Sequence, residues 1–289
     1  MSGILAIHTG GTITMSDGPN GLGTMAGLIE AAFDRISPAA VRLNVISFDP
    51  LVDSADIGPD HWNRLIDLIG SQPNDGVVIT HGTDTMPFTG AALSFALEGI
   101  KTPVILTGSM QPLGVGPHAE ENLRFALQMA EQGPPGVWLA FDGKLMCARS
   151  LVKYHSIGPS SFRESEVEGW AQRAARLSPR HFLPRRLAIL TLSPGICVSA
   201  VDSALRELDG AVVRVFGAGT LMHDPELLRT FSAAISRGCR LVAVSSCEAG
   251  GLLPGAYAAG AALWESGIEN GGKLTPEAAL VRLWLELSG

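Results

Sequence analysis

Hydroxyl-bearing side chains and glycines follow four apolar runs of the sequence, each at the point where the run ends. They occur in the segments 9–12 (TGGT), 53–54 (DS), 81–85 (HGTDT) and 108–110 (GSM). A threonine hydroxyl attacks an acyl group only when a base activates it, because it is almost never ionised near neutrality. A lysine can be such a base, and Lys153 stands alone in a mostly uncharged stretch. The pattern therefore predicts acyl-transfer chemistry.

The same glycines do not match a phosphate-binding motif. Gly10 and Gly11 lack the third glycine that the dinucleotide motif places further on. A second partial match ends at Gly272 and Lys273, but Leu274 stands where that motif needs a magnesium-binding hydroxyl, and no apolar strand precedes it. A nucleotide-binding module is left as a minor alternative, which failure to bind any mononucleotide would remove.

Each candidate residue also has a purely structural interpretation. The two adjacent glycines suit a tight turn between a strand and a helix, and Asp84 or Thr85 suits the N-cap of the helix that follows. Lys153 could be a solvated surface side chain. His81 is more typical of a packed turn than of a metal ligand, since no further ligands stand near it in the sequence. Only the combination of these residues at several strand ends favours catalysis.

The elements that must position these residues alternate between strand and helix. Continuous apolar runs are typical of parallel strands that are covered on both faces. The strand-like runs are 4–7, 41–48, 76–80, 103–107 and 136–141, and the helix-like stretches are 26–36, 59–69, 88–97 and 119–131. This alternation predicts a doubly wound, mostly parallel α/β sheet. Ligands bind beyond the carboxyl ends of such strands, where the candidate residues stand.

A second, smaller α/β domain is expected after a linker. Residues 176–186 interrupt the alternation with two prolines and a cluster of arginines. We therefore expect a catalytic α/β domain over 1–177, a linker over 178–185 and the smaller domain over 186–289. The last helix is expected to begin after Thr275, as N-cap, with Pro276 in its first turn. Its expected buried stripe is Leu280, Leu283, Trp284 and Leu287.

Composition excludes several classes of protein. The 289 residues are 46% apolar and 17% charged, with a net charge of −7, so a sizeable core is expected and nucleic acid is a poor partner. No apolar stretch approaches the ~20 residues of a membrane span, and the first residues do not resemble a secretory signal. The four cysteines lack metal or disulfide spacing. We expect a cytoplasmic protein with free thiols, no metal and no membrane partner.

At this point the sequence resembles a known family. Thr9-Gly10-Gly11-Thr12 with its strand resembles the first signature of bacterial L-asparaginases, and residues 80–86 resemble their second. The resemblance continues through residues 53–54, 107–110, Lys153 and 255–278, and so spans nearly the whole chain. The end of the chain is similar to the cytoplasmic, type I branch.

The resemblance implies hydrolysis of the side-chain amide of L-asparagine to L-aspartate and ammonia, without metal or cofactor. Thr12 would be the nucleophile that forms an acyl-enzyme. Thr83, Asp84 and Lys153 would form a hydroxyl–lysine–carboxylate group, and backbone N–H groups near the two threonines would form the oxyanion hole. The implied substrate-binding residues are Gly11, Asp53, Ser54, Gly82, Asp84 and Ser109.

Further expectations come from the same resemblance. Type I enzymes can carry an allosteric asparagine site, and Arg214 and Cys247 stand at similar positions. The family assembles as dimers, often paired into tetramers, so a homodimer or homotetramer is expected. Two positions depart from the family. Its mobile loop usually carries a tyrosine, which residues 14–24 lack, and Ala55 stands where Gln or Ser is frequent.

Other functions on the same scaffold are left open by the residues. A glutaminase differs only by accommodating one more methylene, which is worth about 1–3 kcal/mol. A subunit that deamidates tRNA-linked amino acids fits less well, because the chain is acidic and carries no added RNA-binding domain. A non-catalytic amino-acid sensor would bind asparagine without releasing ammonia.

Overall fold

The computed structural model describes residues 2–18, 21–25, 27–37, 41–71, 73–166, 176–257 and 260–289. The described residues fall into two compact units. The N-terminal unit holds residues 2–164 and 176–181, and the C-terminal unit holds residues 165–166 and 182–289. The boundaries predicted around 178–185 stay a prediction.

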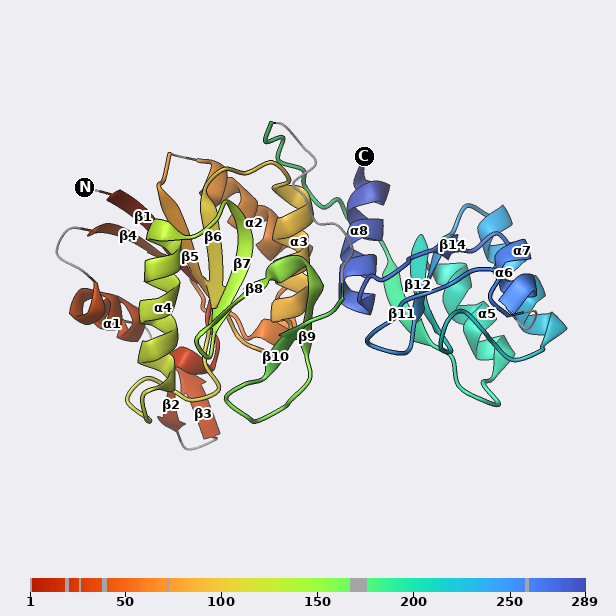
Figure 1. The fold of residues 1–289 in the computed structure, drawn as a ribbon, viewed down its shortest axis with the longest axis horizontal. Helices are drawn as coiled ribbons and strands as arrows, with labels where there is room; N and C mark the ends of the chain where they lie inside the picture. Colours follow the sequence, from red (N-terminus) through yellow and green to blue (C-terminus); the bar gives the residue numbers. More distant parts are fainter. Residues whose placement is uncertain are drawn as a thin grey trace. The chain divides into compact units, whose positions relative to one another are not determined.

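A six-stranded sheet forms the centre of the N-terminal unit (Figure 1). Its order is β4 (Val41–Ser47), β1 (Ser2–His8), β5 (Gly76–Thr80), β6 (Pro103–Thr107), β7 (Gly136–Phe141) and β8 (Lys144–Cys147). The first five strands are parallel and β8 is antiparallel to β7. The predicted mostly parallel sheet is confirmed. The strand order reverses around β1, so the β1–β5 boundary is where a ligand site is expected.

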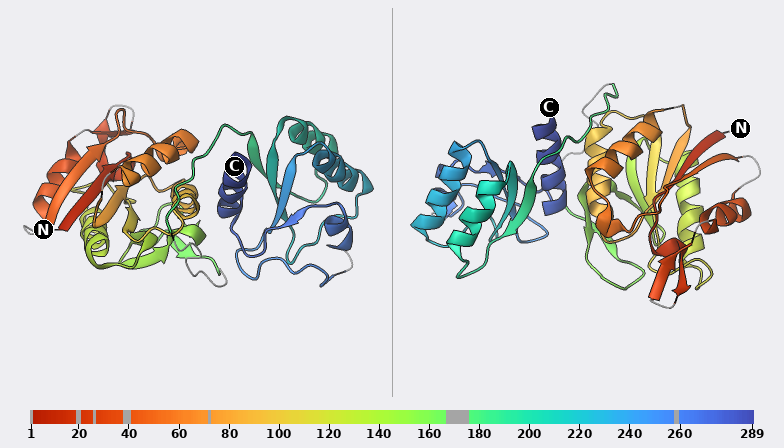
Figure 2. Two further views of the ribbon diagram at one scale, coloured as in Figure 1. Left: turned by 90° about the horizontal axis from the view of Figure 1, so that it is seen from above. Right: turned by 180° about the vertical axis from the view of Figure 1, so that it is seen from behind.

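Helices cover both faces of this sheet. Helices α1 (Leu28–Ile36) and α4 (His118–Gln132) pack against each other and share a core with Ile4 and Ala6 of β1. The alternating Leu5 and Ile7 are buried too. Helices α2 (Pro59–Gly70) and α3 (Met86–Ala96) pack together, and Figure 2 shows α2 on the opposite face, seen from behind. This double covering explains why the strands are apolar without alternation.

Two hairpins add to the predicted elements. Strands β2 (Met15–Gly18) and β3 (Gly21–Thr24) pair antiparallel after a 3₁₀ turn at Thr12–Thr14, and Figure 1 shows them beyond the end of the sheet. The segment that corresponds to the family's mobile loop, residues 14–24, contains this hairpin. Strands β9 (Leu151–Lys153) and β10 (Phe162–Glu164) form the second hairpin, which carries Lys153. Short 3₁₀ turns at 54–56 and 148–150 complete the unit.

The C-terminal unit is a smaller parallel α/β layer structure, as predicted. Its sheet has the order β11 (Leu187–Thr191), β12 (Gly210–Val215), β13 (Arg240–Ser245) and β14 (Glu269–Asn270), all parallel. Helices α5 (Val198–Glu207), α6 (Pro225–Ser236) and α7 (Ala261–Glu265) share one core with this sheet, and α8 (Pro276–Ser288) packs on β11, β12 and β13.

The last helix confirms one local prediction and corrects another. The Thr275 hydroxyl accepts a hydrogen bond from the Ala278 N–H at 3.1 Å, so the predicted N-cap is present. Of the predicted stripe only Leu283 is fully buried. The buried positions are Ala278, Ala279, Val281, Leu283 and Leu285. Small alanines let the helix approach the sheet closely, which a stripe chosen by side-chain size overlooks.

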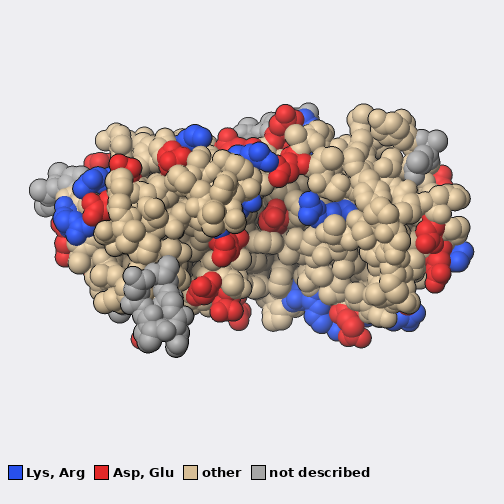
Figure 3. Space-filling model, turned by 90° about the horizontal axis from the view of Figure 1, so that it is seen from below, with Lys and Arg blue, Asp and Glu red and all other residues tan. Residues whose placement is uncertain are grey.

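The surface carries no dominant charge on the face drawn in Figure 3, where acidic and basic side chains lie among each other between uncharged ones. None of the helices in the described residues has both the length and the apolar character that a membrane span needs. Among the same residues, no three His, Cys, Asp or Glu side chains gather as metal ligands would.

Candidate active site

The two glycine-containing signatures meet at the β1–β5 boundary. Gly11 has φ +94°, and a Cβ on it would lie 2.5 Å from both Cα and N of Gly82. Both the backbone conformation and the close approach therefore require glycine at position 11. Because Thr12 and Thr83 directly follow these glycines, this backbone contact brings the two candidate hydroxyls into one site.

Similar close approaches draw the neighbouring strand ends together. A Cβ on Gly82 would lie 2.6 Å from Oγ of Ser54, which follows β4. Gly10 packs on the Val52 carbonyl, and Gly108, after β6, packs on the His81 carbonyl. Glycines thus join the ends of β1, β4, β5 and β6 at one edge, as the strand-end pattern predicted.

Lys153 reaches the second signature from the β9 strand. Its Nζ donates hydrogen bonds to Thr83 Oγ1 at 2.9 Å and to Asp84 Oδ1 at 2.5 Å. The Lys153 side chain is 13% exposed, so it is not the solvated surface residue of the structural alternative. The Asp84 side chain is 72% exposed, which leaves much of its carboxylate open to a ligand. The predicted hydroxyl–lysine–carboxylate group is assembled.

The Thr12 hydroxyl has no hydrogen-bond partner among the described residues that would compete with a substrate. Thr12 opens the 3₁₀ turn and is half-buried. Over the same residues, the backbone N–H groups of Thr12 and Thr83 bond no protein acceptor. Acyl transfer needs an available hydroxyl as nucleophile and available N–H donors as oxyanion hole, and these roles of Thr12 and Thr83 stay predictions.

The 53–55 segment offers acidic and polar groups at the same edge. The exposed Asp53 accepts a hydrogen bond from the Ala55 N–H at 2.9 Å, and Ser54 is buried. Thr85 occupies the N-cap position of α3, but its hydroxyl makes no cap bond. It donates instead to the Ser54 carbonyl at 2.5 Å. Thr85 therefore occupies the expected N-cap position without capping the helix. Its side chain instead connects the end of β5 to the segment that follows β4.

Ser109 lies at the predicted edge, but its hydroxyl is already bonded. It is 1% exposed, lies 2.9 Å from His118 Nδ1 and accepts a hydrogen bond from the Gln111 N–H at 3.0 Å. These contacts hold the loop between β6 and α4. Its role in substrate binding stays a prediction.

Buried histidines lie at the strand ends: His81 is the packed turn residue that was expected, whereas sequence reasoning missed the buried His8. His81 lies 2.6 Å from the Gly82 carbonyl through Nδ1 and 2.9 Å from the Thr89 hydroxyl through Nε2, and Trp62 Nε1 donates to that hydroxyl at 3.1 Å. Burial lowers the pKa of His81 to about 4, so the ring is neutral at pH 7. For His8, the available signal was its position as the last residue of β1.

Arg214 and Cys247, the predicted regulatory residues, lie close together in the C-terminal unit. Arg214 Nη2 donates to the carbonyl of Ser246 at 3.3 Å, and Ser246 precedes Cys247 in the chain. The Arg214 Nε is buried and has no hydrogen-bond partner among the described residues. A buried guanidinium N–H without an acceptor is costly, and a ligand carboxylate would satisfy it.

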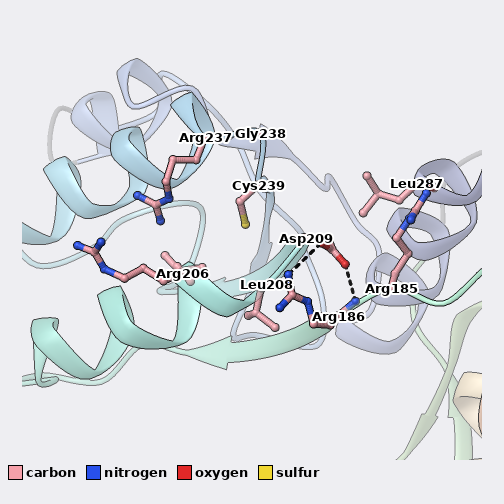
Figure 4. Close-up of a pocket in the computed structure, with 10 residues that line it drawn as sticks. Arg185, Arg186, Arg206, Leu208, Asp209, Arg237, Gly238, Cys239 and Leu287 are labelled. Carbon is pink, nitrogen blue, oxygen red and sulfur yellow. Dashed lines mark hydrogen bonds and ion pairs between the residues drawn. The ribbon is translucent and has the colours of Figure 1, made fainter.

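A pocket of about 410 Å³ in the same unit does not offer comparable chemistry (Figure 4). It lies at the amino ends of β11, β12 and β13, the edge opposite to that used for ligands in parallel sheets. Three of its arginines already have partners: Arg186 pairs with Asp209, Arg206 pairs with Asp202, and Arg185 donates to a backbone carbonyl.

Comparison with known proteins agrees with this geometry. Residues 3–177 match the model "Asparaginase, N-terminal", and residues 186–289 match the "Glutaminase/Asparaginase C-terminal domain". The chain is 29% identical to L-asparaginase 1 of Escherichia coli K12 over 99% of its length and 91% of that protein. It is 30% identical to the L-asparaginase of Thermococcus kodakarensis, over 97% and 91%.

A solved structure extends the match to three dimensions. L-asparaginase I from Vibrio cholerae superposes with a TM-score of 0.88 at 30% identity, covering 99% of this chain and 93% of that one. Family model, curated relatives and solved structure thus coincide over both units, and the chain belongs to the asparaginase family.

Proposed function

We propose that this protein hydrolyses the side-chain amide of L-asparagine to L-aspartate and ammonia through an acyl-enzyme on Thr12. The asparaginase activity follows from membership of the family. The roles of individual residues are our proposal. The observation that carries it is the contact of Lys153 with both Thr83 and Asp84, beside the glycines that join the two signatures.

In the first half-reaction, Thr12 Oγ1 attacks the amide carbon and its proton passes to the departing nitrogen, which leaves as ammonia. The N–H groups of Thr12 and Thr83 receive the negative charge that develops on the amide oxygen. One such donor is worth about 3 kcal/mol in the transition state.

In the second half-reaction, water attacks the ester carbon and releases aspartate and the free Thr12 hydroxyl. Thr83 and Lys153 assist by proton transfer: with the lysine amine neutral, Thr83 passes its proton to Nζ as it takes one from the attacking water, and the proton returns to Thr12 Oγ1 when the ester bond breaks. Asp84 orients the lysine and binds the ammonium group of the substrate, together with Asp53. Ser54 and the backbones of Gly11 and Gly82 bind the α-carboxylate.

The test is ammonia release from asparagine and glutamine over a concentration series. Thr12→Ala and Thr83→Ala are each expected to lose nearly all activity while still folding. Thr102→Ala is the matched control, since Thr102 lies at the opposite edge of the same sheet with its hydroxyl on a backbone carbonyl. Wild-type rates in either site variant would overturn the mechanism, and asparagine binding without ammonia would indicate a sensor.

The same series tests the regulatory proposal. We propose that a second asparagine molecule binds with its carboxylate on Arg214, near Cys247, because the Arg214 Nε lacks an acceptor. A sigmoidal rate curve that becomes hyperbolic in Arg214→Met is expected. We also propose a cytoplasmic homodimer or homotetramer, which light scattering of the purified protein would check.

A further inference from the structure

His8 stands at the centre of a polar row beneath the turn that carries Thr12. It ends β1 and pairs in register with Ser47 of β4 and Thr80 of β5. It is 1% exposed. Its Nδ1 lies 2.7 Å from the Thr80 hydroxyl and its Nε2 lies 3.1 Å from the Thr14 hydroxyl. The ring therefore connects two hydroxyls that belong to different elements.

Thr14 is the residue through which His8 reaches the nucleophile. It closes the 3₁₀ turn that Thr12 opens, and its N–H donates to the Gly11 carbonyl at 3.2 Å. Its own carbonyl accepts the Met25 N–H at 2.8 Å, which closes the base of the β2–β3 hairpin. Thr14 thus joins the nucleophile turn, the hairpin and His8.

Thr80 is the residue that His8 contacts at the other end of this connection. It is the last residue of β5 and the first residue of the second signature, in which Gly82 contacts Gly11. A bridge from Thr14 to Thr80 therefore ties the loop of the nucleophile to the loop of Thr83 by a second contact, in addition to that of the two glycines.

The protonation state of His8 allows its ring to bridge two hydroxyls. Burial lowers the pKa of His8 to about 4, against the opposing effect of the Glu30 carboxylate. The neutral imidazole has one donor and one acceptor, so each ring nitrogen can serve one hydroxyl. Glu30 itself accepts from Ser47 at 2.6 Å.

We propose that His8 is a positioning residue for the reaction, which holds the Thr12 turn at a set distance from the second signature by bridging Thr14 to Thr80. This inference rests on the proposed nucleophile. His8 touches no reacting atom, so its loss should lower the rate of acylation and leave the affinity for substrate nearly unchanged.

Two variants separate the halves of the bridge. His8→Asn places its amide near the former Nδ1 and keeps the bond to Thr80, whereas the longer His8→Gln reaches toward Nε2 and keeps the bond to Thr14. We expect kcat to fall about 10-fold or more in both variants, because each breaks one end of the bridge and small displacements of a reacting group are costly. KM should change little in either variant.

The readout that isolates positioning is covalent labelling of Thr12 by an asparagine analogue with an electrophilic diazoketone, followed by intact mass. Labelling should slow in His8→Asn in parallel with kcat, in protein that thermal unfolding shows to be folded. Thr14→Val should give the same defect, and the double variant should be no worse than either single one.

Each outcome decides a separate question. Wild-type kcat in His8→Asn or in His8→Gln, or additive loss in the double variant, would overturn the inference. Failure of the wild type to become labelled at Thr12 would overturn the proposed nucleophile instead.

Discussion

The two units have similar sheet edges, but different side chains lie at these edges. Both sheets are parallel at their centres, and in both the residues of interest lie at or just beyond the carboxyl ends of strands. In the N-terminal unit, glycine contacts draw four strand ends together around Thr83, Asp84 and Lys153. In the C-terminal unit, the edge offers Arg214 with an unbonded Nε beside an exposed Cys247.

The difference teaches that a parallel sheet supplies a place for a ligand and that the side chains decide what happens there. Hydroxyls, a lysine and unbonded N–H groups can form and break an acyl bond. A guanidinium can hold a carboxylate, and beside it lies the thiol of Cys247 in place of a hydroxyl paired with a lysine. We therefore regard the first edge as catalytic and the second as suited to binding.

The largest expected effect separates the two edges by kinetics. Lys153→Met removes the proposed proton acceptor of Thr83 and is expected to lower kcat about 10³-fold. Arg214→Met should keep the rate at saturating asparagine and lose only the sigmoidal dependence. A steady-state ammonia assay of both variants checks this contrast. Comparable losses of kcat in the two would contradict the division into a catalytic and a binding edge.

A second prediction compares glycines with positive φ at the two edges. Gly11→Ala would push a Cβ to 2.5 Å from the Gly82 backbone, whereas Gly250, with φ +89°, has open space around its Cβ position. Gly11→Ala and the comparison variant Gly250→Ala both carry backbone strain of about 1–3 kcal/mol. Only Gly11→Ala should also separate the signatures and cost about 10²-fold in kcat. Matched thermal melts and rate measurements would reveal whether the contact, rather than strain, matters.

The third prediction concerns acid, and its effect is on stability and not on rate. Burial lowers the folded-state pKa of His8 and His81 from 6.5 to about 4, so between these values the unfolded chain binds more protons. Stability of the N-terminal unit is then complete above pH 6.5 and is lost as pH falls toward 4. Lowering pH from 7 to 5 should cost about 2 kcal/mol per histidine.

The C-terminal unit is the internal control for this prediction, because its one histidine, His223, is exposed. Hydrogen exchange followed by mass spectrometry at pH 7 and pH 5, corrected for intrinsic exchange rates, reports each unit separately. Protection should drop more in β1 and β5 than in β12 and β13. Equal drops would show that the buried histidines do not control acid stability.

Much of the fold and of the site was predictable because the signals are local. Apolar runs located the main parallel strands to within a few residues, and strand ends located the threonines. The hairpins were missed because the short β2, β3, β9 and β10 have weak patterns. The buried His8 was missed because it bonds Thr80 across 72 positions of the chain, whereas His81, expected as a packed turn residue, has its partners within eight positions.

The sequence by itself determined the parallel α/β class, the order of the elements and the residue types at each strand end, since these depend on periodicity and on neighbouring residues. Only the tertiary structure decided which of those residues touch. Lys153 meets Thr83 across 70 positions, and Gly11 meets Gly82 because neither has a Cβ. The hydroxyl of Ser109, by contrast, was drawn into the core. The physical reason is that packing and hydrogen bonding between distant segments, which no local pattern encodes, assign each polar group its partner.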